Sequence, residues 1–279
     1  MKNKITLFLS AAVMLLVVSS CQKMKRPELG DYIKDANPPN SPLRFYTAMD
    51  GSTTDNLRNA VDSIKANFPS SNSMTSTAGI SGKAMKGADG QSIVYGSAND
   101  IGKATSLTIA FWMKNTDQGR TEFVFSLVDD KYGWSHSAIF LLLEHGSPTA
   151  TTFKLGLMDQ WMEFPDGNKF NKPLLDGNWH HLAMVYDQTT SKVNYYFDGA
   201  AVTGAPASAT DVKNGANPRG ALDLSSVNKF IIGGWNKHGN AQGPTDDWIK
   251  SYTGSIDQFR LYNKALTAAE VQALYAAKL

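Results

Sequence analysis

The 279-residue sequence predicts an all-β fold, a sandwich of two antiparallel sheets, closed by a short C-terminal helix. The main observation is a series of short apolar stretches separated by turn residues, which is the spacing of sandwich strands. A second observation is the alternation in 107–113, where every second residue from Leu107 to Met113 points to one face, as in a half-buried strand. The predicted strands are 43–49, 92–95, 107–113, 122–128, 138–143, 153–158, 179–186, 192–197, 230–233 and 255–262.

Turn and capping residues mark the ends of several elements. Asp198-Gly199 follows the predicted strand 192–197, and Asp-Gly is a strong turn signal. Near the C-terminus, Thr267 and Glu270 have the spacing of a capping box, in which the threonine caps the helix and the glutamate bonds back to it. This spacing predicts a brief terminal helix, and a second short helix is predicted at 55–66.

Composition and charge limit the class of protein. Hydrophobic residues make up 42% of the chain and charged residues 19%, which is typical of a globular protein and not of a disordered one. The formal net charge of +2, without a basic stripe or a recognised motif, argues against a nucleic-acid partner. Cys21 is the single cysteine, so stability cannot come from an intramolecular disulfide and must come from a hydrophobic core.

The N-terminal residues have the pattern of an export signal. Lys2 and Lys4 precede an apolar run at 5–18, which at about 14 residues is shorter than the ~20 that span a bilayer as a helix. The Val-Ser-Ser-Cys motif that ends at Cys21 resembles the lipobox of bacterial lipoproteins, where a signal peptidase cuts before the cysteine and the thiol carries diacylglycerol. We therefore predict a signal peptide at 1–20 and lipidation of Cys21. An ordinary secretory signal shares the basic start and the apolar run, and it is the alternative.

The remaining chain divides into a tether and one domain. Residues 21–41 are polar and contain prolines, which predicts a flexible tether. Residues 42–279 have the usual size of one large all-β domain. Gln22 follows the lipidated position, in place of the aspartate that resembles an inner-membrane retention signal. We therefore predict a lipid-anchored protein of a bacterial cell envelope, at the outer membrane, and leave its leaflet open.

Four segments in order resemble the laminin-G-like, concanavalin A-like domains of many bacterial surface lipoproteins. The last segment is the most specific, because it combines a glycine, an apolar-Asp pair, a strand ending in Tyr-Asn, and Ala-Leu before a capped helix. The resemblance covers 43–279 and implies a jelly-roll sandwich, with one of its two sheets curved into a shallow groove. The four segments are 107–114, 177–187, 195–199 and 254–267.

The resemblance implies several activities, because a fold alone does not settle function. Relatives include glycan-binding modules, adhesive domains and, more distantly, glycoside hydrolases. Similar domains often hold a structural calcium, for which Asp50 and Asp257 are the candidates, since the first and last strands commonly lie side by side. Hydrogen bonding of Asp257 to backbone amides is the alternative, and it is favoured.

The sequence predicts that the domain is not an enzyme. A glycoside hydrolase needs two carboxylates about 5–5.5 Å apart for retention and farther apart for inversion. The Glu-x-Asp-x-Glu pattern of glucanase relatives is absent, and Asp159 and Glu163 would lie near 13 Å apart along a strand. His180 and His181 lie on opposite faces of a predicted strand, so they cannot chelate one ion together. We expect one of these histidines to be packed and hydrogen-bonded and the other to be exposed.

Tryptophans among polar residues indicate a glycan-binding site. Flat aromatic faces stack on the C–H surfaces of sugars, while nearby amides and carboxylates hold hydroxyl groups, and loops on a rigid scaffold often carry both. Trp134 and Trp161 are the preferred contacts, whereas burial at a strand end is an equal alternative for Trp235 and Trp248. A protein partner for these aromatic loops is the rival hypothesis. The candidate ligand-binding residues are Trp134, His136, Asp159, Trp161, Trp235, Asn236 and Trp248.

Overall fold

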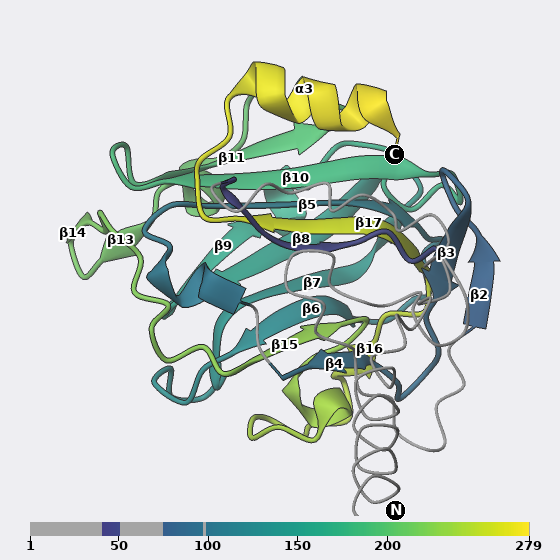
Figure 1. Ribbon diagram of the computed structural model, residues 1–279, viewed down its shortest axis with the longest axis horizontal. Coiled ribbons are helices and arrows are strands. Elements are labelled where there is room, and N and C mark those ends of the chain that lie inside the picture. The colour runs from purple at the N-terminus through teal and green to yellow at the C-terminus, as the bar shows by residue number, and fades with distance from the viewer. Residues whose placement is uncertain (1–40, 51–74, 97–98, 279) are drawn as a thin grey trace, which may run out of the picture. The chain divides into compact units, whose positions relative to one another are not determined.

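Two antiparallel sheets stacked face to face form the described part of the computed structural model, which covers residues 41–50, 75–96 and 99–278 (Figure 1). The described residues all belong to one compact unit, 37–279. The predicted signal peptide, most of the tether, Cys21 and the predicted helix 55–66 lie outside the described residues. No helix within the described ranges is both long and apolar enough to cross a membrane.

The first sheet follows the order β12-β11-β10-β5-β17-β3-β2, and β1 also pairs with β17. The C-terminal strand therefore lies beside the first strand, as the resemblance implied. The strands of this sheet are β1 (Leu43–Thr47), β2 (Thr75–Ala78), β3 (Lys83–Lys86), β5 (Leu107–Lys114), β10 (His180–Asp187), β11 (Lys192–Phe197), β12 (Ala200–Ala201) and β17 (Ser255–Tyr262).

The second sheet follows the order β4-β15-β6-β7-β8-β9, with a short parallel strand, β16, paired to β6. Its strands are β4 (Ile93–Tyr95), β6 (Glu122–Val128), β7 (Ser137–Ser147), β8 (Ala150–Leu157), β9 (Gln160–Phe164), β15 (Lys229–Ile232) and β16 (Lys250–Ser251). The smaller elements are η1 (Asn99–Lys103), η2 (Asp166–Asn168), α2 (Ala207–Thr210), β13 (Lys213–Asn214), β14 (Asn217–Pro218) and η3 (Asn236–Gly239).

The main core fills the space between the two sheets. The inward face of β5 carries the alternating residues that the sequence predicted, and Phe111 is fully buried. Its ring stacks on Phe259 of β17 at 5.0 Å and meets Phe125 of β6 edge-on at 6.1 Å, so it contacts both sheets. Burying one such side chain stabilises the fold by about 1.5–3 kcal/mol.

All ten predicted strands overlap strands of the structure. Three of them, β6, β11 and β17, have the predicted bounds. Prediction missed β2, β3 and β9 and the two-residue strands β12, β13, β14 and β16, and it therefore placed Trp161 in a loop although the residue lies on β9. These strands lack an apolar run because β2 is an exposed edge strand and β9 buries only two of its five residues.

The outer face of the first sheet is covered by the predicted C-terminal helix, α3 (Ala268–Ala277), drawn in yellow above β11 in Figure 1. The capping box is present: Thr267 Oγ accepts the Glu270 amide at 3.2 Å, and the Glu270 carboxylate accepts the Thr267 amide at 2.7 Å. Val271 is fully buried against this face, and the Tyr275 ring stacks on Trp112 at 5.4 Å. The helix therefore stabilises the face opposite the main core.

Removing the N-cap of α3 should destabilise the domain measurably. The Thr267→Ala substitution leaves the Glu270 amide without its side-chain acceptor, and we expect a loss of about 1 kcal/mol. Chemical denaturation followed by circular dichroism measures the change. Thr203→Ala, at an exposed loop position, is the control and should stay within about 0.5 kcal/mol of the wild type. Equal stability of the two variants would contradict a stabilising role for the cap.

Candidate functional site

Three tryptophans are the large hydrophobic side chains that stay exposed in the described residues. Trp134 is 53% exposed, Trp161 40% and Trp248 45%. The Trp134 ring lies 6.0 Å from Trp161 and 6.5 Å from Trp248, measured between centroids. They come from the turn between β6 and β7, from β9 and from the loop before β16. We call these three residues the tryptophan patch.

A buried aromatic layer on the outer face of the second sheet supports the tryptophan patch. Phe123, Phe140 and Trp235 stack on one another, with Trp235 4.4 Å from Phe123 and 4.9 Å from Phe140. Trp134 rests on Trp235 at 5.3 Å, and Trp161 meets the edge of Phe140 at 5.2 Å. The exposed rings therefore have a packed floor beneath them, which restricts their positions.

A glycine in β8 makes room for this layer. Gly156 pairs with Phe140 of β7 on one side and with Trp161 of β9 on the other. A Cβ atom at Gly156 would lie 2.2 Å from the Phe140 ring, which is closer than any real contact. The small residue therefore lets two aromatic rings from neighbouring strands come together above β8.

The structure corrects the prediction that Trp235 and Asn236 contact a ligand, because both are fully buried. The indole Nε1 of Trp235 donates to Ser137 Oγ at 2.8 Å. The Asn236 side chain accepts from Ser126 Oγ at 2.8 Å and donates to the carbonyl of His136 at 2.7 Å. These two residues hold the floor and the turn that carries Trp134, so their role is to position the site.

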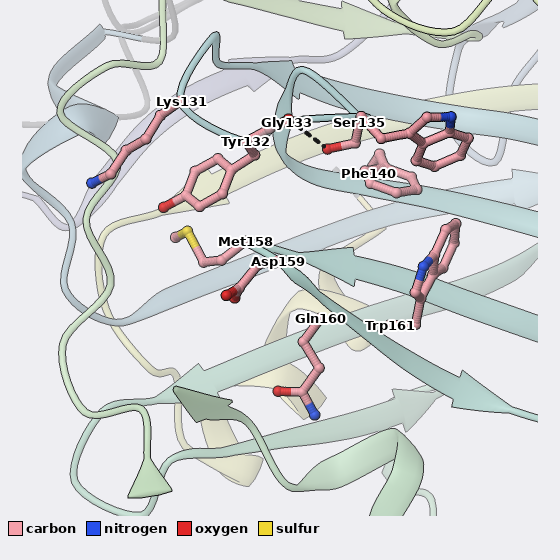
Figure 2. A pocket seen from close by; sticks show the side chains of 10 residues that line it. Lys131, Tyr132, Gly133, Ser135, Phe140, Met158, Asp159, Gln160 and Trp161 are labelled. Atoms are coloured by element: carbon pink, nitrogen blue, oxygen red, sulfur yellow. Dashed lines mark hydrogen bonds between the residues drawn. The ribbon is translucent and has the colours of Figure 1, made fainter. Parts of the chain in front are cut away.

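A recess of about 480 Å³ lies beside the tryptophan patch (Figure 2). In Figure 2, Lys131 and Tyr132 stand at one side of the recess, Trp161 at the other, and Met158 and Asp159 between them. The walls come from the β6–β7 turn and from the β8–β9 turn with the start of β9. The lining residues are Lys131, Tyr132, Gly133, Trp134, Ser135, Phe140, Met158, Asp159, Gln160 and Trp161.

The polar groups beside Trp161 are held by the segment that contains β13 and β14. The Asp159 carboxylate forms an ion pair with Arg219. The Gln160 side chain donates to the carbonyl of Asp211 at 2.9 Å and accepts the amide of Lys213 at 2.7 Å. Because Asp159 is still 62% exposed, its carboxylate is accessible to a ligand while it remains paired.

The turn that carries Trp134 is closed by its own residues. The amide of Asp129 donates to the carbonyl of His136 at 2.9 Å, and the Asp129 carboxylate accepts the amide of Lys131 at 2.9 Å. Burial raises the pKa of Asp129. His136, another predicted ligand contact, has a left-handed backbone, and its ring lies 3.8 Å from Asp130 and outside the lining of the recess.

The two acids considered for catalysis do not form a reacting pair in the structure. Asp159 lies in the β8–β9 turn and pairs with Arg219, whereas Glu163 lies on β9 with its carboxylate 3.5 Å from Lys154. Asp159 is the acidic side chain among the lining residues. A double displacement at this recess would therefore lack its second carboxylate.

The structure also corrects the expectation that one of the paired histidines is exposed, because both are buried. His180 bonds to Asp198 at 2.9 Å and to Asp176 at 3.0 Å. Burial opposes the charged ring of His180, but the hydrogen bonds that the ring donates to the two carboxylates outweigh it and raise the pKa of His180. Burial lowers the pKa of His181 to about 4. Both His180 nitrogens are occupied by carboxylates, and the buried His181 ring lies beside Trp112 and Tyr275, so neither ring is available to a ligand.

The two calcium candidates both face the hairpin turn between β2 and β3. Asp257 accepts the amide of Ile80 at 2.8 Å, which is the backbone hydrogen bond favoured from the sequence. Asp50 accepts the amide of Lys83 at 2.5 Å. Burial raises the pKa of Asp257 to about 7, and the nearby charge of Asp50 adds to the rise. The two carboxylates therefore repel each other across a turn that both of them stabilise.

The donor set around these acids fits a calcium ion only in part. Oδ1 of Asp257 is buried without a partner, which is an oxygen that a hard cation could use. Calcium takes six to eight oxygen ligands. Two carboxylates alone supply too few, so several backbone carbonyls and waters would have to provide the rest. No group of three or more His, Cys, Asp or Glu suited to a metal occurs in the ranges that the structure describes.

Sequence reasoning found the exposed tryptophans but missed the floor and most of the recess. Phe140, Met158 and Gln160 were not predicted as site residues. A signal for them exists: 122–128 and 138–143 are apolar at nearly every position instead of alternating. Such runs are typical of strands that are buried on both faces. They therefore indicate that other parts of the chain pack on the outer face of this sheet.

The stacked sheets, the terminal helix and the aromatic recess define a concanavalin A-like β-sandwich. The profile of the concanavalin A-like lectin/glucanases superfamily matches residues 87–272. The chain belongs to this family. A curated mouse (Mus musculus) relative is "Sushi, von Willebrand factor type A, EGF and pentraxin domain-containing protein 1", 26% identical over 174 residues. The match spans 61% of this chain and only 4% of the mouse protein.

Solved structures share the fold at low sequence identity. Domain 4 of AbnA, a GH43 extracellular arabinanase from Geobacillus stearothermophilus in complex with arabinotriose, has a TM-score of 0.50 and 19% identity. The match covers 84% of this chain and 98% of that domain. The botulinum neurotoxin type G receptor binding domain has a TM-score of 0.55 and 12% identity. The match covers 85% of this chain and 51% of that chain. A structure of botulinum neurotoxin type C, whose cell entry is described as dependent on interaction with two ganglioside molecules, has a TM-score of 0.55 and 12% identity. The match covers 86% of this chain and 52% of that chain.

The stability of the domain should fall as pH rises from about 4 to about 7 through Asp257. Its folded pKa of about 7 exceeds the unfolded value near 3.9, so the folded state holds a proton that the unfolded state has lost in this window. Asp257→Asn keeps an acceptor for Ile80 and removes the titration. We expect the free energy of unfolding of the variant, relative to that of the wild type, to increase by up to about 4 kcal/mol between pH 4 and pH 8. Urea denaturation at a series of pH values measures this difference.

Repeating the Asp257 measurements with calcium chloride and with a chelator provides the control for a bound ion. A cation bound between the carboxylates would lower the pKa of Asp257 and remove the wild type's loss of stability above pH 4. A difference between variant and wild type that stays constant from pH 4 to pH 8 in chelator would contradict the raised pKa.

Proposed function

We propose that the chain is a lipid-anchored, non-catalytic glycan-binding protein of a bacterial cell envelope that captures polysaccharide or adheres to it. The tryptophan patch carries this proposal. Within the described residues, every exposed large hydrophobic side chain is a tryptophan, and the three rings lie together, with Trp134 and Trp161 in the lining of one recess. Exposing them without a ligand leaves apolar surface in water, so a clustered exposed patch is typical of a binding site.

The chemistry of the recess suits a sugar. Indole rings offer flat apolar faces with a polar edge, and sugars offer flat C–H faces bordered by hydroxyl groups. Asp159 and Gln160 bring a carboxylate and an amide to the lining of the recess. A few polar groups among apolar ones is the usual composition of a small-molecule site.

The packing beneath the patch favours binding at low entropic cost. Phe123, Phe140 and Trp235 fix the floor, and Asn236 ties the Trp134 turn to it. A side chain that is already ordered loses less conformational entropy when a ligand arrives, so more of the contact energy contributes to affinity. The packed floor therefore supports capture by a preformed surface.

The comparisons support the same class of ligand. One relative in fold is described as a complex with arabinotriose, and cell entry of another is described as dependent on interaction with two ganglioside molecules. Each statement belongs to that protein, and at this identity the likeness concerns the fold. The superfamily also includes glucanases. Asp159 is ion-paired, and no second acid occurs among the described residues that line the recess, which supports binding without hydrolysis.

The envelope location rests on the N-terminal sequence. The basic start, the short apolar run and the Val-Ser-Ser-Cys motif support cleavage before Cys21 and acylation of its thiol. Gln22 supports transfer to the outer membrane. Two or three acyl chains hold a protein to a bilayer far more firmly than one chain does, so the glycan-binding domain would stay at the membrane surface.

Glycan binding should depend on the exposed rings. We expect Trp134→Ala and Trp161→Ala in the full-length chain each to weaken binding by about thirtyfold, since truncating a central aromatic contact costs about 2 kcal/mol. A glycan array identifies the bound sugar, and isothermal titration with that sugar measures the loss. Incubation with the same polysaccharide, followed by analysis for released oligosaccharides, tests for hydrolysis.

His145→Ala is the matched control for the tryptophan variants, because His145 is an exposed ring residue at the end of β7 remote from Trp134. It should bind as the wild type does. Array binding that survives both tryptophan substitutions would contradict a site at the patch. Silence across the array, together with capture of a protein by the same surface, would favour the protein-binding alternative, and released oligosaccharide would make the chain an enzyme.

Lipidation should depend on Cys21 alone. In a bacterial host fed radiolabelled palmitate, the wild-type chain should take up label and partition into detergent, and Cys21→Ala should lose both properties. Ser10→Ala, within the apolar run, is the control and should stay labelled. An unlabelled wild-type chain that is cleaved and released would indicate the ordinary secretory signal instead.

A further inference from the structure

Each of the three segments that contribute a ring to the tryptophan patch also carries an exposed acidic side chain. An exposed aspartate precedes each exposed tryptophan by no more than four residues: Asp130 before Trp134, Asp159 before Trp161, and Asp247 before Trp248. Asp246 adds a further exposed carboxylate to the last of these loops. The pattern recurs in three segments that are remote in sequence and meet at one surface.

Two cations at the recess are already ion-paired. Lys131, in the lining, forms an ion pair with Asp223, and Arg219 forms an ion pair with Asp159. The Arg219 side chain is only 11% exposed, so little of its guanidinium faces solvent. An anionic group on a ligand would therefore meet cations whose charge a carboxylate already balances, even though 47% of the Lys131 side chain is exposed.

Further cations lie at Lys213, whose backbone amide donates to Gln160, and at Lys237 on the Trp248 side of the patch. Lys237 donates its ammonium to the carbonyls of Asp246 at 2.7 Å and Thr245 at 3.4 Å. Asp130, Asp246 and Asp247 have no lysine or arginine partner among the described residues, and the ring of His136 is the nearest basic group to Asp130, at 3.8 Å. The patch thus carries an excess of negative charge, although the whole chain has a formal net charge of +2.

We infer that the tryptophan patch selects uncharged glycans and discriminates against glycans that carry carboxylate, sulfate or phosphate groups. The inference rests on the proposed glycan-binding function and specifies its ligand class. Hydroxyl groups can bond to Asp159 and Gln160 without altering their ion pair and hydrogen bonds, whereas an acidic group meets unpaired carboxylates and occupied cations. Like-charge juxtaposition of this kind determines specificity more than it determines affinity.

The expected discrimination is modest and depends on salt. Exposed charges several ångströms apart in water interact weakly. Two or three unpaired carboxylates should therefore weaken the binding of an acidic ligand by about fivefold at low ionic strength. The Debye length falls to about 8 Å at physiological salt and about 3 Å at 1 M, so the discrimination should shrink as salt is added. Stacking on indole rings does not share this salt dependence.

The test uses the full-length chain and an array of neutral oligosaccharides printed beside counterparts that carry sialic acid, uronic acid or sulfate on the same backbone. We expect neutral members to bind and acidic counterparts to bind about fivefold more weakly at low salt, with convergence at 1 M. Equal or stronger binding of the acidic counterparts would overturn the inference and leave the glycan-binding function intact. No binding to any member would overturn the glycan-binding function and the inference with it.

A charge-matched pair of variants locates the effect. Asp246→Asn/Asp247→Asn should reduce the preference for neutral members, because it removes two unpaired charges beside Trp248. Asp117→Asn/Asp166→Asn changes the net charge equally at exposed positions near the other ends of β7 and β9, and it should leave the preference unchanged. An identical shift for both double variants would show that total charge, and not the acidic border, sets the preference.

Discussion

The architecture depends on a sheet that must bury both of its faces. β6 is buried at all seven positions and β7 at its first seven, so their outer side chains need a cover just as the inner ones do. The first sheet meets the same requirement with α3, while the second sheet meets it with Trp235 and Ile249 from a loop. That loop cover is incomplete, and three indole rings finish it while remaining partly in water. The tryptophan patch is thus the exposed upper layer of a second, smaller core.

This origin explains why the site is both rigid and available. The turn with Trp134 and the strand with Trp161 rest on one aromatic stack, and Gly156 gives that stack its space. The buried amide of Asn236 joins the turn to β6 and β7 through the hydroxyls of Ser126 and Ser137. Polar groups at the base of an apolar layer are costly unless they are fully bonded, and these bonds specify one arrangement. A ligand would meet rings that are already in place.

The fold could be predicted from the sequence because many of its strands and turns are marked by patterns of neighbouring residues. Alternation in 107–113, the Asp-Gly turn and the Thr267–Glu270 capping box each depend on neighbouring residues. The site was predicted only in part. Trp134 and Trp161 stand out as aromatic residues in polar surroundings, but the burial of Trp235 and Asn236 depends on a loop that crosses strands more than ninety residues earlier in the chain. Pairings such as Asp159 with Arg219 depend on the same long-range folding, and no local pattern encodes them.

Hydroxyl-radical footprinting of the tryptophans, with and without a bound neutral polysaccharide, tests the central claim most directly. The account predicts that Trp134, Trp161 and Trp248 are oxidised in the free chain and protected in the complex, while buried Trp112 and Trp235 stay unmodified in both. Oxidation of Trp235 at the rate of the exposed rings would contradict the packed floor. A saturated glycan complex in which the three exposed rings oxidise as fast as before would contradict their role in binding.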